Sequence, residues 1–379
     1  HPLTYDYYPK QIPIINWADF RAFLPFILYL AMGIYAVWGT IKKKDIYSYS
    51  IWFFLIPLSV VSNLFFPVGT FMNERFIFIS SIGFCILLAW LLVEKLPILS
   101  EKIKLKPKSI ALPVFFIILI LYSGKTFTRN EAWKDDLTLF TTDVKVSYNS
   151  AKSTCSAGGK IIEYAQQPEI KADSILHRDY CLQAIQYLER SLEIYPEYAD
   201  AQNLIGNAWY ELELNSVKAI LAYAEVLKHR PYHGVALNNV KIIINNAFNL
   251  LSSGNSVNTP QEILDALLIL DSVKPGLLEL YHLVGTIYGR YLNDLNMSVM
   301  YLEKSAELNN PNHLLYLDMG VAYGMSGNLQ KALESFERAV ELNPNDAQAW
   351  INLGMTYQHM GNTQKASEFI VKGNQLMGK

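Results

Sequence analysis

The chain has 379 residues, enough for two or three domains. Hydrophobic residues make up 51% of it and charged residues only 17%, whereas a soluble domain carries about 25% charge. The deficit is concentrated in residues 20–124, which excludes a fully soluble enzyme, a disordered chain and a collagen-like fibre. The net charge of −2 gives no indication of nucleic-acid binding, and no nucleic-acid partner is expected.

Residues 1–19 lead into the apolar region, which contains four runs free of charged residues. About 20 helical residues cross a bilayer core, and the fourth run is short unless Lys108 and Lys125 snorkel at its ends. The alternative, a set of buried soluble helices, is disfavoured because four such runs fall close together. The sequence therefore predicts a transmembrane region over 20–124, with helices at about 22–41, 46–66, 76–94 and 109–124.

Lysines between these runs predict the topology. Three follow the first run at 42–44, and five lie between the third and fourth runs over 95–108. Short lysine-rich loops stay on the cytoplasmic side of a membrane. Residues 1–19, the turn at 67–75 and everything after 125 are therefore expected on the outer side, which is the periplasm or an organelle lumen.

The second half of the chain is an internal repeat. Gly320 and Gly354 are 34 residues apart, and so are Ala332 and Ala366. This is the period and residue pattern of the tetratricopeptide repeat (TPR), in which small residues let two antiparallel helices approach closely. Weaker copies precede these two. After a juxtamembrane connector at 125–148, we expect a TPR α-solenoid of about six helical hairpins over 149–379, which makes the whole chain all-α.

The repeat register predicts a polar row in this array. The first helix of each TPR hairpin lines the concave face, and five polar residues occupy its fifth or sixth position. Asparagine donates and accepts hydrogen bonds, so such a row could hold an extended peptide by its backbone. The alternative is an ordinary hydrated helix face, and Leu204 and Leu283 at sixth positions weaken the row. The candidate acceptor groove consists of Asn203, Asn239, His282, Asp318 and Asn352.

A second polar candidate lies at the outer mouth of two predicted membrane helices. Glu74 and Arg75 follow a short turn there, and the planar guanidinium of arginine binds phosphate through two hydrogen bonds. The alternative is a solvated turn with a basic anchor at the membrane surface. The seven histidines show no metal-ligand spacing. Cys155 and Cys181 in the first repeat could form a bridge or remain buried thiols.

Several strings resemble the transmembrane and TPR-repeat-containing protein O-mannosyltransferase family. The most specific is SNLFFPVG at 62–69, followed by ER at 74–75 and SIGFC at 81–85. HPLTYD at 1–6 resembles the segment that leads into the C-terminal membrane part of that family. Four residues of this chain resemble the first residues that follow the last membrane helix in that family: Arg129, Asn130, Trp133 and Phe140.

The resemblance implies a GT-C glycosyltransferase that transfers mannose or a related sugar from a polyprenyl-phosphate donor to Ser or Thr of secreted proteins. The catalytic acid of the family lies in its first outer loop, so we expect the general base upstream of His1 and interpret the chain as a C-terminal portion. Arg75 and Glu74 would then bind the lipid phosphate. No tightly bound cofactor is expected, and a divalent metal remains an open alternative. The expected partners are the lipid bilayer, the lipid-linked sugar, and a protein or peptide acceptor on the concave TPR face.

Two functions without catalysis remain as alternatives. One is a membrane-anchored TPR receptor or scaffold, and the other is a structural subunit of an export complex. Abundant Ile, Lys, Asn and Tyr suggest a bacterial source, in which the TPR domain would be periplasmic and anchored in the inner membrane. In a eukaryote the same topology places it in the lumen of the endoplasmic reticulum.

Overall fold

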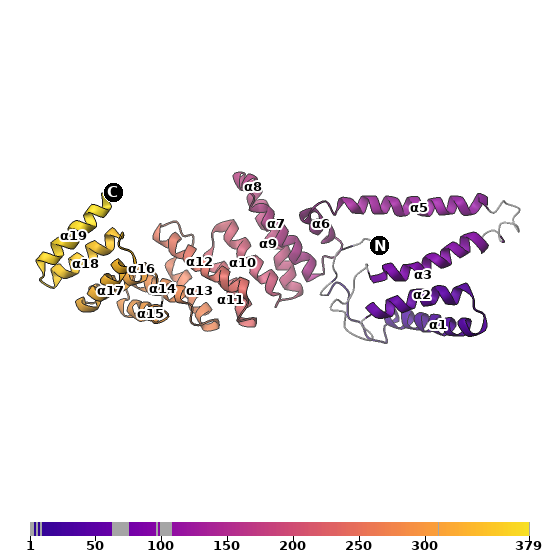
Figure 1. The fold of residues 1–379 in the computed structure, drawn as a ribbon, viewed down its shortest axis with the longest axis horizontal. Coiled ribbons are helices and arrows are strands. Elements are labelled where there is room, and N and C mark those ends of the chain that lie inside the picture. The colour runs from indigo at the N-terminus through magenta and orange to yellow at the C-terminus, as the bar shows by residue number, and fades with distance from the viewer. Residues whose placement is uncertain are drawn as a thin grey trace. The chain divides into compact units, whose positions relative to one another are not determined.

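The computed structural model describes residues 4, 7, 10–62, 76–95, 98, 108–309 and 311–378, and it describes only the backbone of 108–111. Every regular element within these residues is helical, which confirms the all-α prediction for this part of the chain. The chain divides into two compact units, His1–Tyr198 and Ala199–Lys379. Figure 1 shows the helices in chain order, from indigo in the first unit to yellow at the C-terminus.

Apolar helices make up the first part of unit 1. Asp19 caps the first helix by accepting a hydrogen bond from the backbone N–H of Arg21 at 2.9 Å. Asp45 caps the second through the backbone N–H of Ser48, also at 2.9 Å. Each cap satisfies an N–H group that a helix start otherwise leaves unpaired. The helices are α1 (Phe20–Lys42), α2 (Ile46–Val61), α3 (Ile77–Trp90) with the π-helical turn η2 (Leu91–Lys95), and α5 (Lys108–Glu131).

Within the described residues, three helices rather than the predicted four are long and apolar enough to cross a membrane: Phe20–Lys42, Ile77–Lys95 and Leu112–Glu131. The prediction carried the second helix from 46 to 66, but α2 ends at Val61, and residues 63–75 lie outside the described part. Its 16 residues span about 24 Å, which is less than a hydrocarbon core of about 30 Å. The run predicted to end at 124 continues instead through Lys125, because a lysine near a helix end can extend its charge toward water.

A buried ion pair forms the corner where the chain leaves the last apolar helix. Arg129 in the last turn of α5 donates two hydrogen bonds to Asp143, at 2.6 and 2.8 Å, and the Asp143 side chain is fully buried. Asp143 ends the short helix α6 (Asp136–Asp143). The hydroxyls of Thr4 and Ser147 lie 2.8 Å apart, so the N-terminal segment also contacts this corner.

The rest of the described chain consists of antiparallel helical hairpins. The hairpin in unit 1 pairs α7 (Ala151–Ala165) with α9 (Ser174–Ile194), with the short helix α8 (Pro168–Ala172) between them. Cys155 and Cys181 on these helices are buried, and no disulfide joins them. In unit 2, the first two hairpins pair α10 (Ala199–Glu213) with α11 (Ser216–His229) and α12 (Gly234–Ser252) with α13 (Pro260–Val273). The next pairs α14 (Leu278–Thr286), extended by the π-helical turn η3 (Ile287–Tyr291), with α15 (Leu295–Glu307). The last two pair α16 (His313–Met325) with α17 (Leu329–Leu342) and α18 (Ala347–His359) with α19 (Thr363–Met377).

Glycine allows the two helices of a hairpin to approach closely. A Cβ atom at Gly320 on α16 would lie 2.6 Å from Cδ1 of Phe336 on α17. A Cβ atom at Gly354 on α18 would lie 2.7 Å from Cγ1 of Ile370 on α19. Real Cβ atoms essentially never come so close, so the repeated glycine is required by the packing distance. This is the physical basis of its recurrence every 34 residues.

A second repeated feature joins successive hairpins through a tyrosine. Tyr323 on α16 donates a hydrogen bond to Glu303 on α15, the preceding second helix. One repeat later, Tyr357 on α18 donates to Glu337 on α17 at 3.1 Å, and Lys365 on α19 donates to the Tyr357 hydroxyl at 3.4 Å. Burial and the neighbouring Glu303 raise the pKa of Tyr323 to about 12, so its hydroxyl remains a donor at neutral pH.

We expect Gly320→Ala and Gly324→Ala, both on α16, to have opposite effects on stability. Alanine at 320 meets the Phe336 ring and should destabilise the local fold by about 1–3 kcal/mol through overpacking. A Cβ atom at 324 has only the Cβ of Ala332 nearby, at 3.9 Å, and should stabilise the helix by up to about 1 kcal/mol. Amide hydrogen exchange of α16 and α17, in the whole chain in detergent, measures both changes. Equal protection in the two variants would contradict the packing argument.

Candidate functional site

Arg75 and Glu74, the predicted lipid-phosphate ligands, lie outside the described residues. Their role therefore stays a prediction. The general base expected upstream of His1 is likewise outside this chain. The sites whose geometry can be described are a cavity among the apolar helices and the polar row in unit 2.

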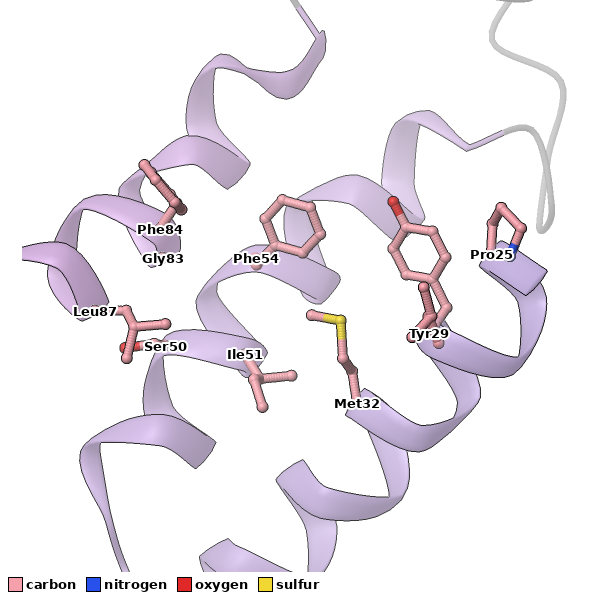
Figure 2. A pocket seen from close by; sticks show the side chains of 10 residues that line it. Pro25, Tyr29, Met32, Ser50, Ile51, Phe54, Gly83, Phe84 and Leu87 are labelled. Carbon is pink, nitrogen blue, oxygen red and sulfur yellow. The ribbon is translucent and has the colours of Figure 1, made fainter. Parts of the chain in front are cut away.

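The cavity among α1, α2 and α3 has a volume of about 460 Å³. Figure 2 shows its apolar side chains, which come from all three helices. Gly83 brings α3 close to α2, because a Cβ atom there would lie 2.7 Å from the backbone nitrogen of Phe54. The polar side-chain groups of the lining are the hydroxyls of Tyr29 and Ser50, and that of Ser50 is buried without a hydrogen-bond partner. The cavity offers a hydrocarbon surface and no acid–base pair.

The five residues of the predicted acceptor groove lie on the first helices of the hairpins in unit 2. They occupy α10, α12, α14, α16 and α18 in turn. Asn203, His282 and Asp318 are buried, whereas Asn239 and Asn352 are partly exposed. The structure joins four of them into two pairs, each linking neighbouring hairpins across 36 residues of sequence.

The first pair is made by asparagine amides. The Nδ2 group of Asn239 donates to Oδ1 of Asn203 at 3.1 Å and to Oδ1 of Asn207 at 3.3 Å. Tyr223 on α11 donates to the same Asn207 oxygen at 2.5 Å. Some of the asparagine hydrogen bonds that were predicted to hold an acceptor peptide are therefore made between the hairpins themselves.

The second pair is the centre of a buried polar cluster. Asp318 accepts hydrogen bonds from Nε2 of His282 at 3.2 Å, from the Thr286 hydroxyl at 2.8 Å, and from Nη2 of Arg290. Burial alone would raise the pKa of Asp318, but the hydrogen bond from His282 and the charge of Arg290 outweigh it and lower the pKa below its ordinary value. Asp318 is therefore ionised at neutral pH.

Asn352, the fifth residue of the row, has a different environment. Its Oδ1 atom accepts a hydrogen bond from Gln348 at 2.8 Å, one turn earlier on α18. The contact lies within a single helix, so it leaves Asn352 at a partly exposed position without the cross-hairpin pairing of the other four.

Sequence reasoning missed Arg290, Thr286 and Asn207. A signal for all three existed in the spacing of neighbours on one helix face, because Thr286 follows His282 by four residues, Arg290 follows Thr286 by four, and Asn207 follows Asn203 by four. Arg290 lies in the π-helical turn η3.

The buried cluster in unit 2 is the densest group of polar side chains along the predicted row. The cluster places a carboxylate, an imidazole, a hydroxyl and a guanidinium together, and the carboxylate is already held by the other three. Across the described part of the chain, no group of three or more His, Cys, Asp or Glu side chains is arranged to hold a metal.

Comparison with known proteins identifies the repeats first. The tetratricopeptide repeat family matches residues 278–312, 314–346 and 335–366. The chain therefore contains TPR repeats, as the 34-residue period predicted.

Similarity to curated proteins extends into the apolar part of the chain. The human protein O-mannosyl-transferase TMTC3 is 26% identical over 355 residues, which is 88% of this chain and 36% of the human protein. The fruit-fly Tmtc3 is 24% identical over 267 residues, 67% of this chain and 27% of that protein. The mouse TMTC1 is 26% identical over 211 residues, which is 54% of this chain and 20% of the mouse protein. The chain thus spans about a third of these relatives or less, and they are animal proteins, which does not support the expected bacterial source.

Solved structures give a more distant comparison. YrrB, described as a TPR protein with an unusual peptide-binding site, is 20% identical with a TM-score of 0.39, covering 51% of this chain and 93% of YrrB. MamA is 20% identical with a TM-score of 0.36, covering 46% of this chain and 95% of MamA. In sequence, the chain combines TPR repeats and apolar helices and is similar to proteins named protein O-mannosyl-transferases.

Proposed function

We propose that the chain is the membrane and TPR portion of a protein O-mannosyltransferase. The reaction transfers mannose or a related sugar from a polyprenyl-phosphate donor to Ser or Thr of secreted proteins. The observation that carries this proposal is the 355-residue similarity to the human TMTC3, which covers the apolar helices as well as the repeats. TPR repeats alone occur in proteins of many functions and would not support it.

The proposed mechanism divides the work between three regions. A carboxylate upstream of His1 acts as general base on the acceptor hydroxyl. Arg75, with Glu74 beside it, binds the lipid phosphate and stabilises the charge that develops on the leaving group. The polar row in unit 2 holds the protein acceptor. No metal is required in this scheme, because the guanidinium supplies the positive charge.

The animal relatives favour the endoplasmic reticulum as the membrane. The lysines at 42–44 would face the cytoplasm, and the repeats would face the lumen, where secreted acceptors pass.

Cysteine labelling in sealed microsomes tests this topology. Lys43→Cys, between α1 and α2, should react with a membrane-impermeant maleimide directly. Asn345→Cys, in an exposed loop of the repeats, should react only after the membrane is permeabilised. The unmodified chain measures the background from its own cysteines. Direct labelling at 345 would reverse the proposed orientation.

Replacement of Arg75 in the full-length protein tests the phosphate site. Arg75→Ala should reduce transfer by about 10²–10³-fold, the usual cost of removing one charge-stabilising donor. Arg75→Lys keeps the charge but loses the planar pair of donors, so transfer should still fall. Arg21→Ala is the matched control, because Arg21 is an exposed arginine beside the start of α1. Full activity of a folded Arg75→Ala protein would refute the role.

Replacement of exposed polar residues in the groove tests acceptor binding. Asp318 is buried and holds three neighbours, so the variant is limited to Asn239→Ala with Asn352→Ala. We expect a higher apparent KM for a long protein acceptor and unchanged turnover of a short peptide. Asn255→Ala with Asn345→Ala, two exposed loop asparagines of the same unit, is the control pair. Equal effects on the long and short acceptors would show that the row is only surface.

A further inference from the structure

A cavity of about 260 Å³ lies beside the buried cluster in unit 2. Its walls come from α14 with η3, from α15 and from α16. Thr286, Arg290, Asn293 and Ser298 form its polar side, and Leu295 and Met325 are among its apolar walls. Neither the repeat pattern nor the named relatives assign a ligand to this cavity.

Asp318 positions the guanidinium at the cavity. Its buried carboxylate accepts hydrogen bonds from His282, Thr286 and Arg290, which occupy three of the roughly four acceptor sites of its two oxygens. The Arg290 side chain is 47% exposed, whereas that of Asp318 is 5% exposed. The guanidinium of Arg290 is thus hydrogen-bonded to the buried Asp318, and the rest of the side chain is partly exposed at the cavity.

The side-chain donors that remain for a ligand are those of the Arg290 guanidinium and of the Asn293 amide. The Ser298 hydroxyl donates to the backbone oxygen of Gly285 at 2.8 Å, and the Thr286 hydroxyl lies within hydrogen-bond distance of both Asp318 and the His282 carbonyl. Arg290 donates to Asp318 through Nη2 and carries further N–H groups in a planar fork. The cavity therefore combines cationic donors with an apolar wall.

The backbone at this point supports a binding role. Arg290 belongs to the π-helical turn Ile287–Tyr291, a rare geometry that occurs frequently at functional sites. Gly289 in the same turn allows α15 to approach, because a Cβ atom there would lie 2.6 Å from Oγ of Ser298.

We propose that this cavity is a subsite for a glutamate side chain of the protein acceptor. A carboxylate matches the guanidinium fork, and the methylene groups of glutamate match the apolar wall. Asp318 balances the charge of Arg290, so the preference arises from direct hydrogen bonds and not from a long-range field. The inference rests on the proposed function, in which the repeats hold the acceptor.

Peptide binding to the whole chain in detergent tests the subsite without requiring sugar transfer. The probe is a fluorescent, extended Ser/Thr-rich peptide with one central glutamate, compared by anisotropy with its glutamine counterpart. We expect the glutamate peptide to bind about 10-fold more tightly, a modest value for a charge-assisted bond at a half-exposed arginine. Arg290→Gln should remove this difference while keeping a donor toward Asp318. Arg338→Gln, at an exposed arginine on α17, should preserve it.

A second variant tests the subsite even if Arg290→Gln unfolds the protein locally. Met325 lies on the cavity wall and is 60% exposed, so Met325→Glu adds a competing carboxylate without removing Arg290. It too should abolish the preference. Equal affinity of the native chain for the two peptides overturns the subsite but leaves the acceptor role of the repeats intact. Failure to bind either peptide overturns both, whereas loss of transfer with the binding preference retained would count only against the proposed reaction.

Discussion

A TPR hairpin cannot bury its apolar face alone, and the structure of unit 2 follows from this constraint. Each hairpin completes its core against the next, so the interface between hairpins is both the source of stability and the place where polar residues meet. The contacts of Asn203 with Asn239 and of His282 with Asp318 lie at these interfaces. The polar row is therefore part of the contact between hairpins and not a separate surface. Its buried members are part of what determines how one hairpin sits on the next.

The repeats could be predicted from the sequence because their constraint is local and periodic. Gly320 and Gly354 recur since each must admit a side chain of the partner helix, and a Cβ atom there would overlap that side chain. The row of polar residues followed from the same register. Its pairings did not, because they depend on side chains of two different hairpins. Arg290 was missed for the same reason, because its partner Asp318 lies on the next hairpin.

In the apolar region, the sequence indicates the type of element more clearly than its ends. Its composition indicates membrane helices clearly but does not fix the end of every helix, because runs of apolar residues end at the first charge and helices end where backbone hydrogen bonding stops. The run ending at 124 passed Lys125 without a break, and α2 ended at Val61 although apolar sequence continues beyond it. The residues with the most specific family resemblance, around Arg75, fall in the part that the structure does not describe, so their chemistry rests on resemblance alone.

The corner made by Arg129 and Asp143 has a consequence for substrate supply. A bidentate pair with a fully buried carboxylate resists bending, so the chain leaves α5 through a fixed turn and not through a flexible linker. In the proposed enzyme, the repeats belong to the same chain as the membrane helices, so an acceptor bound by the repeats stays attached to the membrane that contains the donor. The concentration of its next hydroxyl near the donor is then set by the length of free peptide between groove and membrane, not by the amount of acceptor in solution.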